Sequence, residues 1–375
     1  MCDNRRGRPK STAAQADKRT MWRRAKVDRS GLLTIARKVL EHSLSLQPGE
    51  RVLIVGNPEE TSRLICDAYF EAALQMGGHP LLARQPARGI TDMADPAVLA
   101  AIATEPDIIF SISTDKIGKD PHGLHIGYVG RDGRRYTSIF DKVTEGDRRA
   151  RAATSPGIKM ETFLRCLDVD YAAIRAEAER LKRAVEGASE MRIETPAGTD
   201  LTVGMAGRRV FVDDGDLRRP GSHGNLPCGE IFFSPTLGTA RGRIAFDGVI
   251  AIGAECLIPS EPVVMEVKDG YVTRILPGAH SEAIEASIRR GEAEALAMGK
   301  PDYARNSWGI GEVGLGLNPM ATMIPDMLEA EKVAGTCHVA IGSNYDLDLP
   351  ALTHYDMLMT RPRILVDGRP LEGYQ

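Results

Sequence analysis

Residues 30–167 alternate between two hydrophobic patterns. Apolar side chains recur at helical spacing over 32–46, and a continuous apolar run follows at 51–55, as in a strand buried on both faces. The same alternation continues with a helix predicted over 61–76, a strand over 80–83, a helix over 96–103 and a strand over 107–112. Strands that alternate with helices favour a parallel sheet covered by helices. The pattern therefore predicts an α/β N-terminal domain over 30–167 with a mainly parallel sheet.

The pattern changes after an amphipathic helix predicted over 171–185. Short strand-like runs separated by Gly, Pro and Asp-Gly turns then dominate, with one helix at 281–298, and such spacing indicates antiparallel sheets. The runs lie at 191–195, 200–203, 209–212, 230–233, 240–246, 263–267 and 271–276. We expect a β-rich α+β domain over 168–375.

Two further strands near the C-terminus, at 336–345 and 353–359, each carry a histidine. Residues two apart in a strand share a face, so His354 and Asp356 project together. An imidazole beside a carboxylate suits zinc, manganese, cobalt or iron(II). These strands therefore predict one side of a metal site.

Two acids stand in apolar or glycine-rich surroundings, Glu230 and Glu312, where burial is costly unless the charge is paired or metal-bound. Each single residue also has an ordinary interpretation. Glu230 is equally suited to capping a turn, Glu312 to pairing with an arginine, and His338 to a hydrogen-bonded place in the core. Together with His354 and Asp356 they make a ligand set large enough for two adjacent metals.

Composition excludes several other functions. The net charge of −3 gives no general affinity for polyanions, and the basic arm over 1–29 is expected to be a disordered, solvated tail rather than a minor-groove contact. We expect no nucleic-acid partner and, since no run approaches 20 apolar residues, no membrane segment. Six scattered cysteines without a Cys-x-x-Cys pair predict a cytoplasmic protein.

Two features of the N-terminal domain are weaker candidates. The turn at Gly56 lacks Gly-x-Gly-x-x-Gly, so we predict no dinucleotide site. His122 and His125 fall in a glycine-rich loop, where histidines are mostly solvated, although a place at a cleft stays open.

The chain resembles the thermophilic-type metalloaminopeptidases, the aminopeptidase T and aminopeptidase S family. The likeness extends from Leu32 onward and rests on motifs from both predicted domains. These motifs are Leu46-x-Pro-Gly-Glu-Arg-Val-Leu-Ile54, Asn225-Leu-Pro-x-Gly-Glu230, Gly311-Glu312-x-Gly-x-Gly-x-Asn-Pro319, Glu331-Lys-x-x-Gly-Thr-x-His338-x-Ala-x-Gly342 and His354-x-Asp356.

The resemblance implies a homodimer whose second domain holds two divalent metals (zinc, cobalt or manganese) and uses a metal-activated water to release N-terminal residues from peptides. Tyr345 would be the catalytic tyrosine. For the mechanism we expect Glu312 or Asp356 to bridge the metals, and Glu331, near His338 in sequence, is a candidate general base, with a structural role in which its neighbour Lys332 neutralises it as the open alternative. The implied metal ligands are Glu230, Glu312, His338, His354 and Asp356.

A sister branch of this family is a ring-opening dioxygenase of 2,5-dihydroxypyridine with a single iron(II). In that branch a histidine resembles the position of Glu312, and the first glutamate is missing. Because this chain has Glu230 and Glu312, the motifs favour the hydrolase, with the dioxygenase acting on a small hydroxylated N-heterocycle as the alternative. The segment between the two glutamates is longer than in the thermophilic enzymes and the loop before His354 shorter, so substrate specificity stays open.

Overall fold

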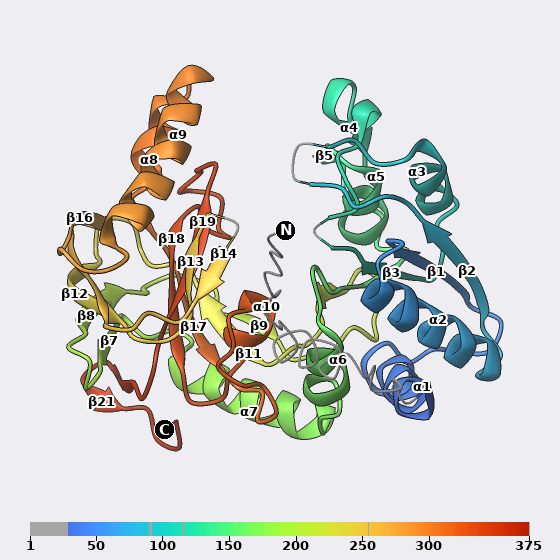
Figure 1. Ribbon diagram of the computed structural model, residues 1–375, viewed down its shortest axis with the longest axis horizontal. Helices are drawn as coiled ribbons and strands as arrows, with labels where there is room; N and C mark the ends of the chain where they lie inside the picture. Colours follow the sequence, from blue (N-terminus) through green and yellow to red (C-terminus); the bar gives the residue numbers. More distant parts are fainter. Residues whose placement is uncertain (1–28, 90–91, 115, 254, 375) are drawn as a thin grey trace, which may run out of the picture.

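The computed structural model describes residues 29–89, 92–114, 116–253 and 255–374. The chain forms two domains, which lie on the right and left of Figure 1. Apart from Arg29, the basic arm predicted over 1–29 lies outside the described residues.

The first domain is built on a five-stranded sheet in the order β10-β6-β3-β1-β2, and every neighbouring pair in it is parallel. Both faces are covered by helices, which explains why β1 and β3 read as continuous apolar runs. The strands are β1 (Arg51–Gly56), β2 (His79–Arg84), β3 (Ile108–Ile112), β6 (Arg151–Thr154) and β10 (His223–Asn225). The other elements are α1 (Arg29–Lys38), the π-helical turn η1 (Val39–Ser43), α2 (Glu60–Gln75), α3 (Pro96–Ala103), α4 (Pro121–His125), β4 (Tyr128–Val129), β5 (Arg135–Tyr136), α5 (Ile139–Asp141), η2 (Lys142–Gly146) and α6 (Met160–Cys166).

Helix α7 (Tyr171–Val185) joins this domain to the second, running along the bottom of Figure 1. Two seven-stranded sheets make up the second domain, in the orders β14-β13-β19-β18-β17-β11-β9 and β16-β15-β12-β8-β7-β20-β21. The strands of the first of these sheets are β9 (Phe211–Asp213), β11 (Glu230–Phe233), β13 (Ile250–Ile252), β14 (Glu255–Leu257), β17 (Ile310–Gly316), β18 (Cys337–Gly342) and β19 (His354–Met359). The remaining elements are β7 (Glu190–Glu194), β8 (Asp200–Gly204), β12 (Arg241–Phe246), β15 (Val263–Lys268), β16 (Tyr271–Ile275), α8 (Ser281–Ala297), α9 (Pro301–Asn306), α10 (Met327–Ala330), β20 (Arg363–Val366) and β21 (Arg369–Pro370).

The predicted fold class, a parallel α/β domain followed by a β-rich α+β domain, is confirmed by this architecture. Several elements differ from their predicted bounds. The helix predicted over 32–46 ends as α-helix at Lys38 and continues as η1, because the Leu44 amide donates to the Val39 carbonyl five residues back. The strand predicted over 209–212 lies at Phe211–Asp213.

Strand β10 belongs to the first sheet although it follows α7 in the chain. It pairs with β6, a partner more than sixty residues earlier, and the segment just after it packs Leu226 and Cys228 into the core of the first domain. The chain thus passes back through the first domain just before Glu230, and this pairing connects the two domains there. The boundary between residues 167 and 168 stays a prediction.

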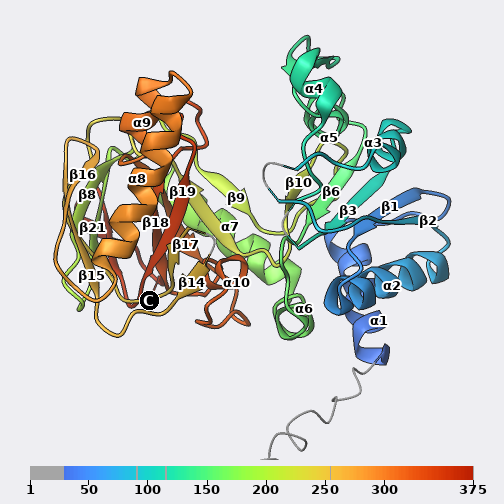
Figure 2. The same cartoon turned by 45° about the horizontal axis from the view of Figure 1, so that its top comes forward.

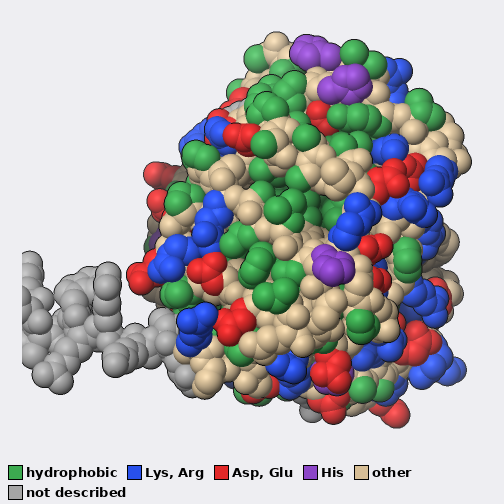
Figure 3. All heavy atoms as spheres, turned by 90° about the vertical axis from the view of Figure 1, so that its right-hand side faces the viewer, with side chains coloured by type: hydrophobic (Ala, Val, Ile, Leu, Met, Phe, Trp, Pro, Cys, Tyr) green, Lys and Arg blue, Asp and Glu red, His purple; other side chains and the backbone are tan. Residues whose placement is uncertain are grey.

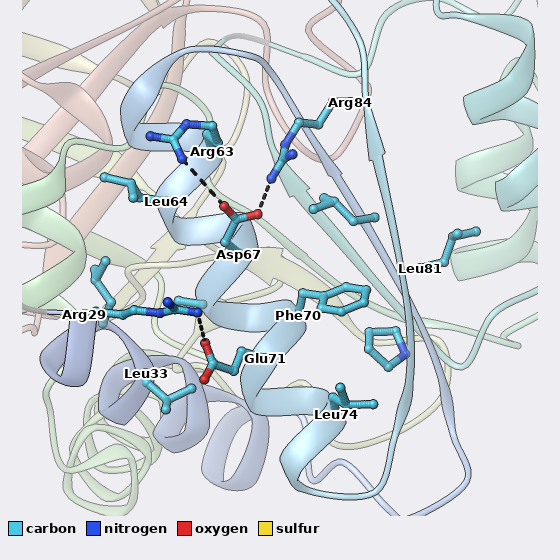
Figure 4. A pocket seen from close by; sticks show the side chains of 14 residues that line it. Arg29, Leu33, Arg63, Leu64, Asp67, Phe70, Glu71, Leu74, Leu81 and Arg84 are labelled. Carbon is cyan, nitrogen blue, oxygen red and sulfur yellow. Dashed lines mark hydrogen bonds and ion pairs between the residues drawn. The ribbon is translucent and has the colours of Figure 1, made fainter.

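A groove on the first domain lies between α1, α2 and the edge strand β2 (Figure 4), with a volume of about 1120 Å³. Hydrophobic side chains gather in the middle of the face of this domain seen in Figure 3. All residues that line the groove fall between Arg29 and Arg84, so it lies apart from the predicted metal ligands. Across the described ranges, no helix is long and apolar enough to span a membrane.

Candidate metal centre

The predicted ligands lie on four adjacent strands, β11, β17, β18 and β19, in the left-hand domain of Figure 1; β17, β18 and β19 can be followed in the same domain in Figure 2. In each strand the neighbouring positions belong to the core between the two sheets: Ile231, Val313, Val339 and Met357 are buried there. Because side chains alternate, the ligands project from the opposite face of the sheet. Antiparallel register then brings Ala340 beside both Glu312 and Asp356, and Gly342 beside His354.

Glycines in β17 provide room for these side chains. Gly314 pairs with His338, and a Cβ built on Gly314 would lie 2.0 Å from His338 Nε2. Gly316 pairs with Glu230, and its Cβ would lie 2.2 Å from the Val333 carbonyl oxygen. Only a residue without a side chain fits at either position, which explains the alternating glycines around Glu312.

Glu312 connects two histidines. Its Oε1 lies 3.1 Å from His338 Nε2, and its Oε2 lies 3.4 Å from His354 Nε2. Each histidine also lies near a second carboxylate: His338 Nε2 is 3.6 Å from Glu230 Oε2, and His354 Nε2 is 3.4 Å from Asp356 Oδ1. The two oxygens of one carboxylate therefore face two separate groups of donors.

The tighter group consists of Glu312, His354 and Asp356, whose donor atoms all lie within 4.8 Å of one another. His354 is oriented by its other nitrogen, since Nδ1 lies 2.8 Å from the Ser343 carbonyl oxygen. A carbonyl only accepts, so Nδ1 carries a proton, and Nε2 is the nitrogen that would face a metal. Such a hydrogen bond is the usual support of a metal-binding histidine.

Lys332 is completely buried beside the other group. Its Nζ lies 2.5 Å from Glu230 Oε1, 2.9 Å from Glu331 Oε1 and 3.1 Å from Asp213 Oδ2. Sheet register places Asp213 opposite Glu230, so both acids reach the ammonium from neighbouring strands. One oxygen of Glu230 is thus held by Lys332 while the other faces His338.

Electrostatics at the centre show an excess of negative charge. Burial alone would lower the pKa of His338, but Glu312 and Glu230 raise it to about 9. The pKa of His354 is raised well above its ordinary value by Asp356 and Glu312 despite burial. Burial would raise the pKa of Asp356, yet His354 lowers it to about 2. The acids stay ionised only with nearby positive charge, which divalent cations also provide.

Buried donor atoms at this centre lack hydrogen-bond partners among the described residues. They are Glu230 Oε2, Glu312 Oε2, Asp356 Oδ1 and His338 Nδ1. Ligand bonds of about 2.1 Å place neighbouring donors roughly 3.0–3.4 Å apart, close to the separations between the histidines and the carboxylates here. The donor set and the unpartnered oxygens therefore fit divalent metal.

Tyr345 lies at the edge of the centre, with 53% of its surface exposed. Its ring meets the His354 ring edge-on at a centroid distance of 5.7 Å. Burial of the phenol and the nearby carboxylates of Glu312 and Asp356 raise its pKa, so the hydroxyl remains a proton donor at neutral pH. Glu331, the predicted candidate base, is paired with Lys332, and burial raises its pKa.

The structure thus brings the five predicted ligands together on one face of one sheet, and it places Tyr345 and Glu331 in turns that adjoin this face. His122 and His125 are exposed on α4, at the tip of the first domain in Figure 1. Sequence reasoning missed Asp213, a strand-ending acid in an apolar run, and underestimated Lys332, which was considered only as a neutralising neighbour of Glu331. In the sequence, the available signal for Lys332 was its place directly after Glu331.

A cluster of carboxylates and imidazoles on a sheet beside an α/β domain defines a metal-dependent enzyme. The family model of NicX, 2,5-dihydroxypyridine 5,6-dioxygenase, matches residues 159–372, more than half of the chain, and the chain belongs to this family. A search of curated proteins found no match.

Two solved structures share the fold. The 2,5-dihydroxypyridine dioxygenase of Pseudomonas putida KT2440 superposes with a TM-score of 0.66 at 16% identity, covering 92% of this chain and 96% of that one. AmpT of Thermus thermophilus, an aminopeptidase T, superposes with a TM-score of 0.59 at 17% identity, covering 92% of this chain and 99% of that one. Both branches of the predicted family are therefore represented, and the family model favours the dioxygenase branch.

Proposed function

We propose that the chain is a two-metal amide hydrolase, an aminopeptidase that removes N-terminal residues from peptides. One observation carries this proposal: the two oxygens of Glu312 face different histidines, at 3.1 and 3.4 Å. A carboxylate so placed is suited to bridge two ions. Glu230 with His338 would complete one ligand group, and His354 with Asp356 the other.

The charges support two ions rather than one. The cluster holds five carboxyls (Asp213, Glu230, Glu312, Glu331 and Asp356) and one buried ammonium, that of Lys332, which contacts three of them. In a metal-bound state with neutral histidine ligands and all five acids ionised, five negative charges and one positive charge would give a net charge of −4, which two divalent cations would balance. A single divalent cation leaves −2 in a buried site, and uncompensated buried charge is costly.

The chemistry at such a site is hydrolysis by an activated water. Two divalent ions supply Lewis acidity and a bound water that is deprotonated near neutral pH. The chain's own residues would orient the substrate and stabilise the charge that develops on its carbonyl oxygen. Tyr345 fits the second task because its raised pKa keeps the hydroxyl protonated as a hydrogen-bond donor beside the centre.

Glu331 is the candidate general base. Burial raises its pKa although Lys332, 2.9 Å away, opposes the rise, and a raised pKa makes the carboxylate a stronger base. A base held this way accepts a proton from the attacking water and passes it to the leaving amine.

A second candidate is a ring-opening iron(II) dioxygenase, favoured by the family match over residues 159–372. The compact group of Glu312, His354 and Asp356 is large enough for one ion. That group contains one histidine and two carboxylates. His338, whose Nε2 lies 3.1 Å from Glu312, would supply the second histidine of the two-histidine, one-carboxylate set that non-haem iron(II) oxygenases typically use.

Metal content together with two assays distinguishes the candidates. Protein stripped with chelator is reloaded with zinc, cobalt or manganese, or anaerobically with iron(II), and the ions per chain are counted by elemental analysis. We expect two ions per chain and release of amine from leucine p-nitroanilide. Glu312→Gln should lose both properties, while Glu266→Gln, on β15, is the matched control. One iron per chain with oxygen uptake on 2,5-dihydroxypyridine would overturn the hydrolase proposal.

A further inference from the structure

Three aromatic rings stand beside the candidate metal centre. Phe211 and Phe232 stack with centroids 5.1 Å apart and planes inclined by 10°. Tyr345 lies over both, at 4.8 Å from Phe232 and 6.0 Å from Phe211, and its other side contacts the His354 ring. These three residues are here called the aromatic cluster, and through Tyr345 the cluster contacts His354, one of the predicted metal ligands.

Strand register makes the aromatic cluster continuous with the ligand face. Phe232 lies two residues after Glu230 on β11, so both project from the same face. Phe232 pairs with Phe211 on one side and with Gly314 on the other, and Gly314 pairs in turn with His338. Because Gly314 has no side chain, the His338 imidazole occupies the space over β17, the strand that separates it from Phe232.

The cluster presents apolar surface where the rest of the site is charged. Phe211 and Phe232 are only partly buried, and Tyr345 is half exposed. On β11 the residues on either side of Phe232, Ile231 and Phe233, are the ones that pack into the apolar core. The guanidinium carbon of Arg209 lies 4.8 Å above the Phe211 ring centroid. This positive charge disfavours a cationic group on the cluster, so a neutral apolar group is the partner that fits.

We propose that the aromatic cluster is the subsite for a large apolar or aromatic side chain of the substrate, next to the bond that is broken. This inference rests on the proposed hydrolase function. Aromatic rings offer offset and edge-on stacking to a phenyl group and broad contact to a leucine side chain. Alanine at the same position reaches little of this surface, and lysine is opposed by Arg209. The cluster thus selects phenylalanine and leucine over alanine and lysine at the substrate N-terminus.

The test compares aminoacyl p-nitroanilides of phenylalanine, leucine, alanine and lysine. Wild-type protein should show kcat/KM at least about tenfold higher for phenylalanine than for alanine, mainly through KM. Phe232→Ala and Phe211→Ala should each reduce this ratio about tenfold while two ions per chain are retained. Phe70→Ala, on α2 in the other domain, should leave activity and ratio unchanged.

Calorimetric binding of L-phenylalaninamide and L-alaninamide gives a readout independent of turnover. We expect tighter binding of the phenylalanine compound in wild type and loss of that difference in Phe232→Ala. Protein that hydrolyses no substrate refutes the hydrolase proposal, and the binding comparison then decides the subsite alone. Equal binding of the two amides, or an unchanged preference in both phenylalanine variants, overturns the subsite.

Discussion

Replacing Lys332 by methionine tests the electrostatic account of the centre. The side chain is fully buried, and its ammonium lies within 3.1 Å of oxygens from Glu230, Glu331 and Asp213. Methionine has a similar length, so the change removes the charge without leaving a large cavity. Removing one partner of a buried ion pair costs about 3–5 kcal/mol, and here it leaves three carboxylates without that cation.

The pH dependence of this loss has a definite sign. Burial already raises the pKa of Glu230 to about 7 and of Asp213 to about 6, above their ordinary values, even with Lys332 present. Carboxyls with raised pKa bind more protons in the folded state than in the unfolded state, so stability falls as pH rises. Without Lys332 these pKa values rise further, so the destabilisation should be largest near pH 8 and smaller near pH 5.5.

The assay is urea unfolding of the metal-free protein, followed by fluorescence of Trp308, which packs against the core of the second domain. Of the two tryptophans only Trp308 lies in that domain. Lys182→Met is the control, because its ion pair with Glu186 is 3.8 Å long and exposed, and exposed pairs contribute at most about 1 kcal/mol. A loss below about 1 kcal/mol at pH 8 for Lys332→Met, or a loss that grows on acidification, would refute the reasoning.

Three further changes test individual parts of the site. Glu312→Gln should reduce bound metal from two ions per chain to none or one, measured by elemental analysis, with the circular dichroism spectrum unchanged. Tyr345→Phe should lower kcat roughly a hundredfold with metal retained, since it removes one oxyanion donor; wild-type turnover would exclude the tyrosine. Gly314→Ala should weaken metal binding and destabilise the fold by about 1–3 kcal/mol, because the new Cβ would lie 2.0 Å from His338 Nε2. Full metal content in that variant would show that His338 moves aside without loss.

The aminopeptidase and dioxygenase candidates share one scaffold, and the ligand set separates them. The family match and the two structural neighbours establish the fold and an enzyme of this family. The choice of chemistry then depends on whether Glu230 and Glu312 both hold metal. Lys332 matters for that choice, because it holds one oxygen of Glu230 and leaves the other facing His338.

Hydrophobic periodicity was sufficient to predict most elements. Helix α7 and strand β11 begin and end where the pattern placed them, since an amphipathic stripe and a bounded apolar run are local properties of the chain. The pairing of His354 with Asp356 on one face also followed from the two-residue period of a strand. Motif spacing in turn indicated Glu230, Glu312 and His338 as members of one site.

Only the tertiary structure decided how those residues meet. The order of β11, β17, β18 and β19 in one sheet, and the register that places Gly314 beside His338, depend on pairing between segments far apart in the chain, such as Glu230 with Gly316. Local sequence does not encode such long-range pairing, so Asp213, the buried ammonium of Lys332 and the aromatic cluster emerged only from the assembled sheet. The same holds for β10, whose return to the first sheet joins the two domains beside Glu230. Local patterns determined the elements and the donor types, and long-range register determined which donors lie together.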